Sequence, residues 1–150
     1  MRYVHTNIVA RDWRKLAEFY KTVFQCREKP PERAFSGAWL DRATGLTDAA
    51  LEGVHLHLPG YGDNGPTLEI FSYADMMGSG ESAANKYGFS HIAFEVDDVK
   101  TTYVMALEKG GKELGKVAEK QVPGIGTLIF VYFKDPEGNI VEIQSWEKDC

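Results

Sequence analysis

The sequence predicts a mixed α+β domain made of two copies of one strand–helix–three-strand module, βαβββ. Two observations carry this prediction: an Asp follows a His at the same spacing in both halves, and a Glu-Ile-x-Ser tetrapeptide occurs in both. A third is the length of 150 residues, which suits one domain with a core of its own. Internal repetition of this kind predicts that both halves fold as the same unit.

Each half opens with a strand that leads into a helix. Residues 5–12 (HTNIVARD) align with residues 91–98 (HIAFEVDD), and each ends in Asp. After each Asp, apolar residues recur at the spacing of an amphipathic helix. Asp is a favourable N-cap because its carboxylate accepts hydrogen bonds from the first turn, and the Gly110-Gly111 pair is typical of a helix end.

The remaining elements are expected to be short strands. In the first half we expect a strand at 3–9, a helix at 12–24 and strands at 26–29, 51–58 and 67–73. In the second half we expect a strand at 89–96, a helix at 99–109 and strands at 112–118, 127–133 and 140–146. The modules then cover residues 1–74 and 88–150, and residues 75–87, which lack an apolar period, form a linker.

Charge and composition exclude several classes of partner. The formal net charge is −5 and there is no run of Lys or Arg, which argues against nucleic acid and acidic membranes. No apolar stretch has the length of a membrane helix, and the first residues lack the apolar region of a signal peptide, so we expect a soluble, cytoplasmic protein. Cys26 and Cys150 have no metal or disulfide spacing and are interpreted as reduced and incidental.

The repeated His and Glu residues are expected to share one kind of face. Alternate side chains of a strand point to opposite sides, and the neighbours of these residues are mostly apolar and suit the helix-facing side. The set on the opposite faces is His5, Glu69, His91 and Glu142. If the modules pack face to face, two imidazoles and two carboxylates suit zinc, nickel, cobalt, iron(II) or manganese. Any one of them alone is more typical of a satisfied polar group, but their repetition favours a metal site.

The chain resembles the vicinal oxygen chelate superfamily, which includes glyoxalase I, methylmalonyl-CoA epimerase, fosfomycin-resistance transferases, bleomycin-binding proteins and extradiol dioxygenases. The segments that carry the resemblance are 5–24, 88–98 (GFSHIAFEVDD) and 133–144 (FKDPEGNIVEIQ). The resemblance implies that paired modules form an eight-stranded open barrel-like cleft. The modules of this family pair within one chain or across a dimer, and we expect a homodimer. The resemblance also implies one metal ion at the positions of the His, Glu, His, Glu set, which is the ligand order of glyoxalase I.

The resemblance also implies a chemistry. A metal polarises a carbonyl group of a small carbonyl or thioester substrate and a carboxylate moves the neighbouring proton, as in a glyoxalase-like or epimerase-like lyase or isomerase. Glu142 is predicted as the base, and Glu69 as a ligand that can act as a second base. Alternatively, both are fixed ligands and a water molecule carries the proton. Val9 and Tyr73 stand where bacterial glyoxalase I has Arg and Asn for glutathione, so glutathione binding is not expected.

Other residues are candidates for the cleft. Thr67, Phe71, Phe130 and Tyr132, together with Leu128, are expected to bind a partly apolar substrate; alternatively, the aromatic rings only fill the barrel.

The remaining candidates lie in the first half. His55 and His57 form a second potential metal pair without a counterpart in the second half, and are interpreted as cavity lining or surface. The turn-rich insertion 30–48 is expected to be a solvated loop; alternatively, it is a lid, or Arg42 contacts an anion.

Two other functions remain open. An iron(II) dioxygenase would use His5, His91 and Glu142 as a two-histidine, one-carboxylate triad. Glu69 argues against it, because a fourth protein ligand closes a position that oxygen needs. A non-enzymatic small-molecule-binding resistance protein is the other alternative, and the complete ligand set argues against it.

Overall fold

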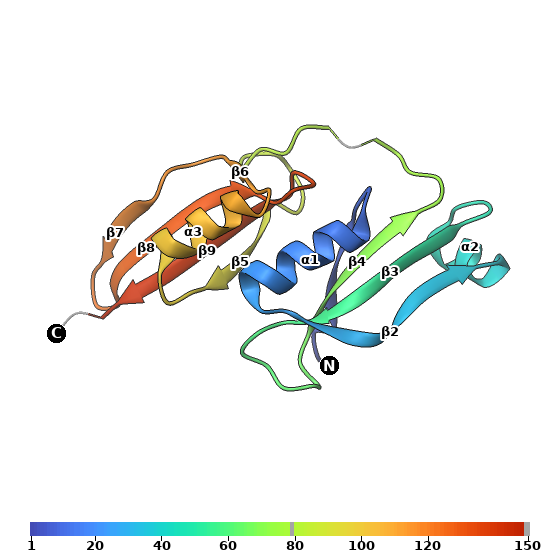
Figure 1. Cartoon of the computed structure of the whole chain (residues 1–150), viewed down its shortest axis with the longest axis horizontal. Helices are drawn as coiled ribbons and strands as arrows, with labels where there is room; N and C mark the ends of the chain where they lie inside the picture. Colours follow the sequence, from blue (N-terminus) through green and yellow to red (C-terminus); the bar gives the residue numbers. More distant parts are fainter. Residues whose placement is uncertain (79, 149–150) are drawn as a thin grey trace. The chain divides into compact units, whose positions relative to one another are not determined.

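The chain folds as two compact units, Met1–Ser79 and Gly80–Cys150, in a computed structural model that describes residues 1–78 and 80–148. Each unit consists of one β-sheet with a long helix on one face (Figure 1). The mixed α+β class and the repeated module are therefore confirmed. None of the described helices is long and apolar enough to cross a membrane.

The first unit contains a four-stranded sheet with the order β1-β4-β3-β2. Its strands are β1 (His5–Val9), β2 (Arg27–Ser36), β3 (Ala50–His57) and β4 (Thr67–Tyr73), and its helices are α1 (Trp13–Phe24) and α2 (Ala38–Thr44). β1 and β4 are parallel, and the other pairs are antiparallel. The Asp12 carboxylate caps α1 by accepting a hydrogen bond from the Lys15 amide at 3.0 Å.

The core of the first unit lies between α1 and the sheet. Leu16 and Tyr20 on α1 are fully buried, as are Leu56, Leu68 and Ile70 on the sheet. Because Leu68 and Ile70 face the helix, the alternate residues of β4 lie on the open face. The core thereby determines which side of the sheet carries the candidate site.

The second unit repeats this plan with α3 (Val99–Glu108) packed on β8 and β9. Its strands are β5 (His91–Glu95), β6 (Lys112–Glu113), β7 (Ala118–Val122), β8 (Gly126–Lys134) and β9 (Ile140–Glu147). The sheet order is β5-β9-β8-β6, and β7 also pairs with β8. As in the first unit, the strand that carries the His runs parallel to the strand that carries the Glu.

The insertion 30–48 is not a solvated loop, so that expectation is wrong. β2 continues to Ser36 because residues 33–36 pair with β3, and α2 follows it. Leu40 of α2 is buried in a cluster with Ala49, Leu51 and Phe71. These non-local contacts order a stretch whose local composition favours turns.

The single strand expected at 112–118 is also wrong in detail. It is divided into β6 and β7, which both pair with β8. More residues separate Glu113 from Ala118 than separate their partners Phe133 and Phe130, so the pairing is interrupted between them. The described residues therefore contain nine strands instead of eight.

Candidate metal centre

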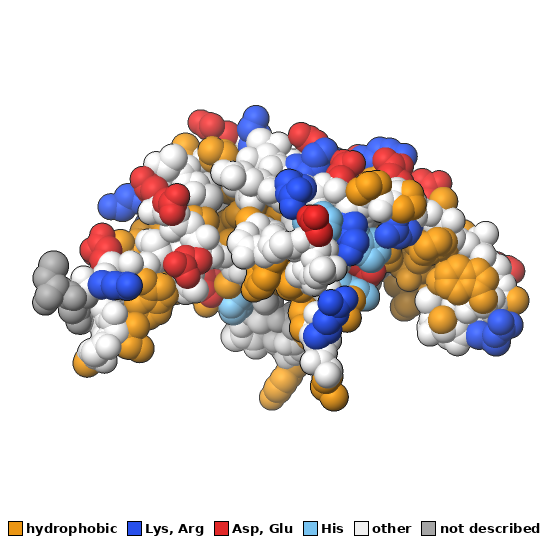
Figure 2. Space-filling view, turned by 90° about the horizontal axis from the view of Figure 1, so that it is seen from below, with side chains coloured by type: hydrophobic (Ala, Val, Ile, Leu, Met, Phe, Trp, Pro, Cys, Tyr) orange, Lys and Arg blue, Asp and Glu red, His pale blue; other side chains and the backbone are white. Residues whose placement is uncertain are grey.

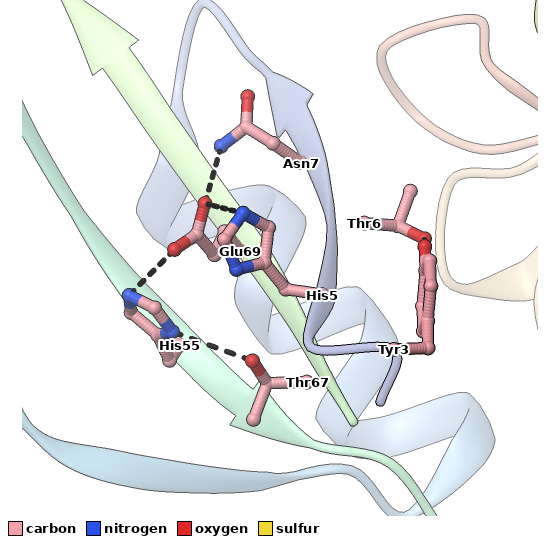
Figure 3. Close-up of polar contacts among 7 residues, drawn as sticks. All are labelled: Tyr3, His5, Thr6, Asn7, His55, Thr67 and Glu69. Carbon is pink, nitrogen blue, oxygen red and sulfur yellow. Dashed lines mark hydrogen bonds and ion pairs between the residues drawn. The ribbon is translucent and has the colours of Figure 1, made fainter. Parts of the chain in front are cut away.

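Glu69 is the centre of a polar cluster on the open face of the first sheet (Figure 3). Its Oε2 atom lies 3.2 Å from His5 Nε2 and accepts a hydrogen bond from Asn7 Nδ2 at 3.3 Å. Its Oε1 atom lies 2.9 Å from His55 Nε2. The glutamate is only 8% exposed. Both carboxylate oxygens are thus held by side chains from the strands on either side of β4.

His55 also belongs to this cluster; it lines a pocket, as expected for cavity lining, but its contact with Glu69 was not predicted. It stands directly opposite Glu69 in the β3–β4 pair, and its Nδ1 atom lies 3.4 Å from Thr67 Oγ1. Burial lowers the pKa of His55, and although Glu69 acts to raise it, Arg33 and other nearby cations lower it further. The imidazole is therefore neutral at pH 7, which is the form that can bind a metal.

The second sheet has a matching His–Glu pair. His91 Nε2 lies 3.0 Å from Glu142 Oε2, and Glu142 is 9% exposed. Tyr132 stands directly opposite Glu142 and packs edge-on against His91, with ring centroids 4.9 Å apart. Burial and, secondarily, the nearby Glu142 carboxylate raise the pKa of Tyr132, so its hydroxyl stays protonated at neutral pH.

The two pairs occupy equivalent positions. In each sheet the Glu lies two residues beyond the residue opposite the His: Thr67 in the first and Ile140 in the second. The four residues predicted as ligands thus form two His–Glu pairs, one within each unit.

The donor chemistry of each pair suits a divalent metal, because imidazole nitrogen and carboxylate oxygen are typical ligands of zinc and similar ions. However, within residues 1–78 and 80–148 no three His, Cys, Asp or Glu side chains are grouped to hold an ion. His5 and His55 contact different oxygens of Glu69 instead of converging on one point. Each unit by itself therefore supplies an incomplete ligand set.

The residues predicted to bind substrate lie near the glutamate of their own unit. Thr67 and the ring of Phe71 both contact His55, with ring centroids of Phe71 and His55 5.8 Å apart. Phe130 packs against Tyr132 with centroids 5.8 Å apart. Phe71 also crosses Gly53, where an added Cβ would lie 2.4 Å from its Cδ1 atom and 2.1 Å from the Ile70 carbonyl oxygen. Gly53 therefore allows this aromatic wall to form.

Other candidates take no part in these pairs. Arg42 is exposed on α2, and Trp39 packs edge-on against Phe35. Cys26 is buried, and burial raises the pKa of its thiol to about 12. Cys150 lies outside the described residues.

The chain belongs to the Glyoxalase/Bleomycin resistance protein/Dioxygenase superfamily, whose family model matches residues 2–143. A crystal structure of a glyoxalase family protein from Bacillus cereus is similar over 97% of this chain and 94% of that chain, with a TM-score of 0.79 and 17% identity. A glyoxalase/bleomycin resistance protein/dioxygenase family enzyme from Burkholderia phytofirmans PsJN is similar over 95% and 97%, with a TM-score of 0.58 and 16% identity. These solved structures support the fold alone. No curated protein matches the sequence significantly.

Proposed function

We propose that the protein is a metal-dependent lyase or isomerase that removes a proton next to the carbonyl group of a small carbonyl or thioester substrate. The observation that carries the proposal is the repeated pair: His5–Glu69 and His91–Glu142 occupy the same register on the open face of each sheet. The same two residue types recur at the same positions although the residues opposite the two glutamates, His55 and Tyr132, differ between the units. A shared ligand role explains the recurrence.

The two pairs are proposed to hold one divalent ion, whether zinc, nickel, cobalt, manganese or iron. Four ligands of this type suit all of these ions, and each unit alone has too few. When bound, such an ion acts as a Lewis acid on a substrate carbonyl and makes the adjacent C–H bond more acidic. The pairs that share an ion come from one chain or from two chains of the expected homodimer.

The surroundings of the two glutamates support different roles for them. Both oxygens of Glu69 are held, by His5, Asn7 and His55, which suits a fixed ligand. Glu142 is held by His91 and has fewer partners to release when it accepts a proton. Tyr132, directly opposite Glu142, keeps its own proton. Glu142 is therefore the proposed base, and Glu69 is the second base only if the reaction uses both faces of the substrate.

Exchange of carbon-bound hydrogen in deuterated water tests the proposal. The metal-loaded protein is incubated with panels of glyoxal derivatives and CoA thioesters, and proton NMR follows the C–H signal next to the carbonyl. We expect exchange with at least one compound and none after the metal is removed. The proposal is wrong if the metal-loaded protein exchanges no compound of either panel.

A further inference from the structure

A small pocket in the first unit adjoins the Glu69 cluster and is bordered by cationic side chains. Its volume is about 150 Å³, and its lining includes Arg2, Lys29, Arg33, His55 and Thr67. In the space-filling view of Figure 2, Lys and Arg side chains lie beside His side chains. Because His55 both lines this pocket and contacts Glu69, whatever occupies the pocket lies next to a proposed metal ligand.

The pairing of β2 with β3 brings two of these cations to the site. Lys29 is opposite His55 and Arg33 is opposite Gly53, the next position of β3 on the same face. The register shifts between Lys29 and Arg33, so the extra residues of β2 bulge out of the ladder. Without this shift another residue of β2 would stand opposite Gly53. The irregularity therefore places two cations at adjoining positions beside His55.

The cations of the pocket have no acidic partner among the described residues, although other basic residues of the unit do. Arg14, Lys21 and Arg27 form ion pairs with carboxylates, whereas Arg2, Lys29 and Arg33 form none within the part of the chain that the structure describes. The Nη1 atom of Arg33 is buried without a hydrogen-bond partner. A buried charged donor without a partner is unfavourable, so it indicates a missing acceptor. In a chain with a net charge of −5, unpaired cations do not reflect a shortage of carboxylates.

We propose that this pocket binds an anionic group of the substrate, and that the substrate is a carbonyl compound with a carboxylate or phosphate. The volume suits one such group and excludes a bulky one. The Arg33 guanidinium can donate two parallel hydrogen bonds to either anion, and Lys29 adds a second charge. The substrate class rests on the proposed function. The anion site does not, because it is inferred from the pocket and its cations alone.

Titration with inorganic phosphate and with acetate tests the anion site without measuring activity. Binding to the full-length protein, as purified and after removal of metal by a chelator, is followed by isothermal calorimetry and amide chemical shifts. Arg33→Gln and Lys29→Gln remove pocket charges, and Arg42→Gln removes one exposed charge from α2 of the same unit. We expect phosphate or acetate to bind wild type and Arg42→Gln equally, and Arg33→Gln to raise the Kd at least tenfold.

Several results would overturn the proposal. These are no binding of either anion by wild type, an unchanged Kd in Arg33→Gln, or a loss of affinity in Arg42→Gln of the same size. If Arg33→Gln does not fold, Lys29→Gln decides, and an unchanged Kd there overturns the site. Metal content is measured on the same samples. Metal binding without anion binding defeats this inference alone, and anion binding without metal binding defeats the proposed function alone.

Discussion

The two units use the same scaffold to surround a His–Glu pair with different neighbours. Opposite Glu69 stands His55, whereas opposite Glu142 stands Tyr132. On the other side, Asn7 is opposite Glu69 and donates to it, whereas Ala93 is opposite Glu142 and has no donor to offer. The His–Glu pair is thus common to both units, and its neighbours hold the carboxylate of Glu69 with more contacts than that of Glu142.

The aromatic wall next to each glutamate also differs between the units. In the first, Phe71 of β4 crosses Gly53 of β3. At the equivalent positions of the second, Phe130 of β8 stands opposite Gln144 of β9. Each sheet therefore has one aromatic ring beside its glutamate, but the ring comes from β4 in the first unit and from β8 in the second. The two units fill the same position with residues from different strands.

Replacing each glutamate by glutamine should give the largest difference between the two units. Glu142→Gln should retain the metal but lower the C–H exchange rate by about 10²–10⁴-fold, because it removes the proposed base. Glu69→Gln should lose metal, because it removes a restrained ligand. Elemental analysis and exchange NMR on both variants check this, and full exchange activity in Glu142→Gln would contradict the assignment.

The thiol of Cys26 gives a probe that reports on the first unit alone. Its pKa of about 12, against 9.0 for an unperturbed thiol, lowers the thiolate fraction at pH 8 by about a thousandfold. In a Cys150→Ser variant, a disulfide reagent should therefore label Cys26 only when the first unit opens. Since the folded state binds the proton more tightly than the unfolded state, the free energy of unfolding should fall as the pH rises from about 9 towards 12. Immediate labelling of the folded protein at pH 8 would contradict the burial.

Removing His55 tests whether the first pair depends on the residue opposite its glutamate. His55→Ala should weaken metal binding by about 10–100-fold. The substitution removes the contact of His55 Nε2 with Glu69 Oε1, so this oxygen is no longer oriented. His57→Ala is the matched control, since the described contacts of Glu69 do not include His57. Competitive metal titration measures the metal affinity of both variants. Equal losses of affinity would show that His55 has no specific role in orienting Glu69.

Gly53→Ala tests the aromatic wall and should have the smallest effect. The new Cβ would clash with the Ile70 carbonyl and with Phe71, so we expect a loss of about 1–3 kcal/mol in the free energy of unfolding. Gly62→Ala, where a Cβ meets nothing within 4 Å, should be neutral to within about 0.5 kcal/mol. Urea unfolding with Cys26 labelling as the readout compares the two variants, and equal stabilities would contradict the close approach of Gly53 to the Ile70 carbonyl and Phe71.

The predictable part of the site follows from local periodicity. Alternation in β1, β4, β5 and β9 is enough to put His5, Glu69, His91 and Glu142 on open faces, and the contact of each His with its Glu agrees with it. The contact of His55 with Glu69 was not predicted, because it depends on how β3 pairs with β4 across the loop between them. The β2–α2 stretch was missed because pairing with β3 and burial of Leu40 order it, and neither contact is local.

The metal content per chain decides whether the two His–Glu pairs hold a divalent ion. Wild type and the double variant His5→Ala plus His91→Ala are purified without chelators or a histidine tag, and elemental analysis measures their divalent ions. The account predicts about one ion per chain in wild type and loss of that ion in the double variant. No bound ion in wild type, even after incubation with nickel, zinc, cobalt, manganese and iron(II), would contradict it.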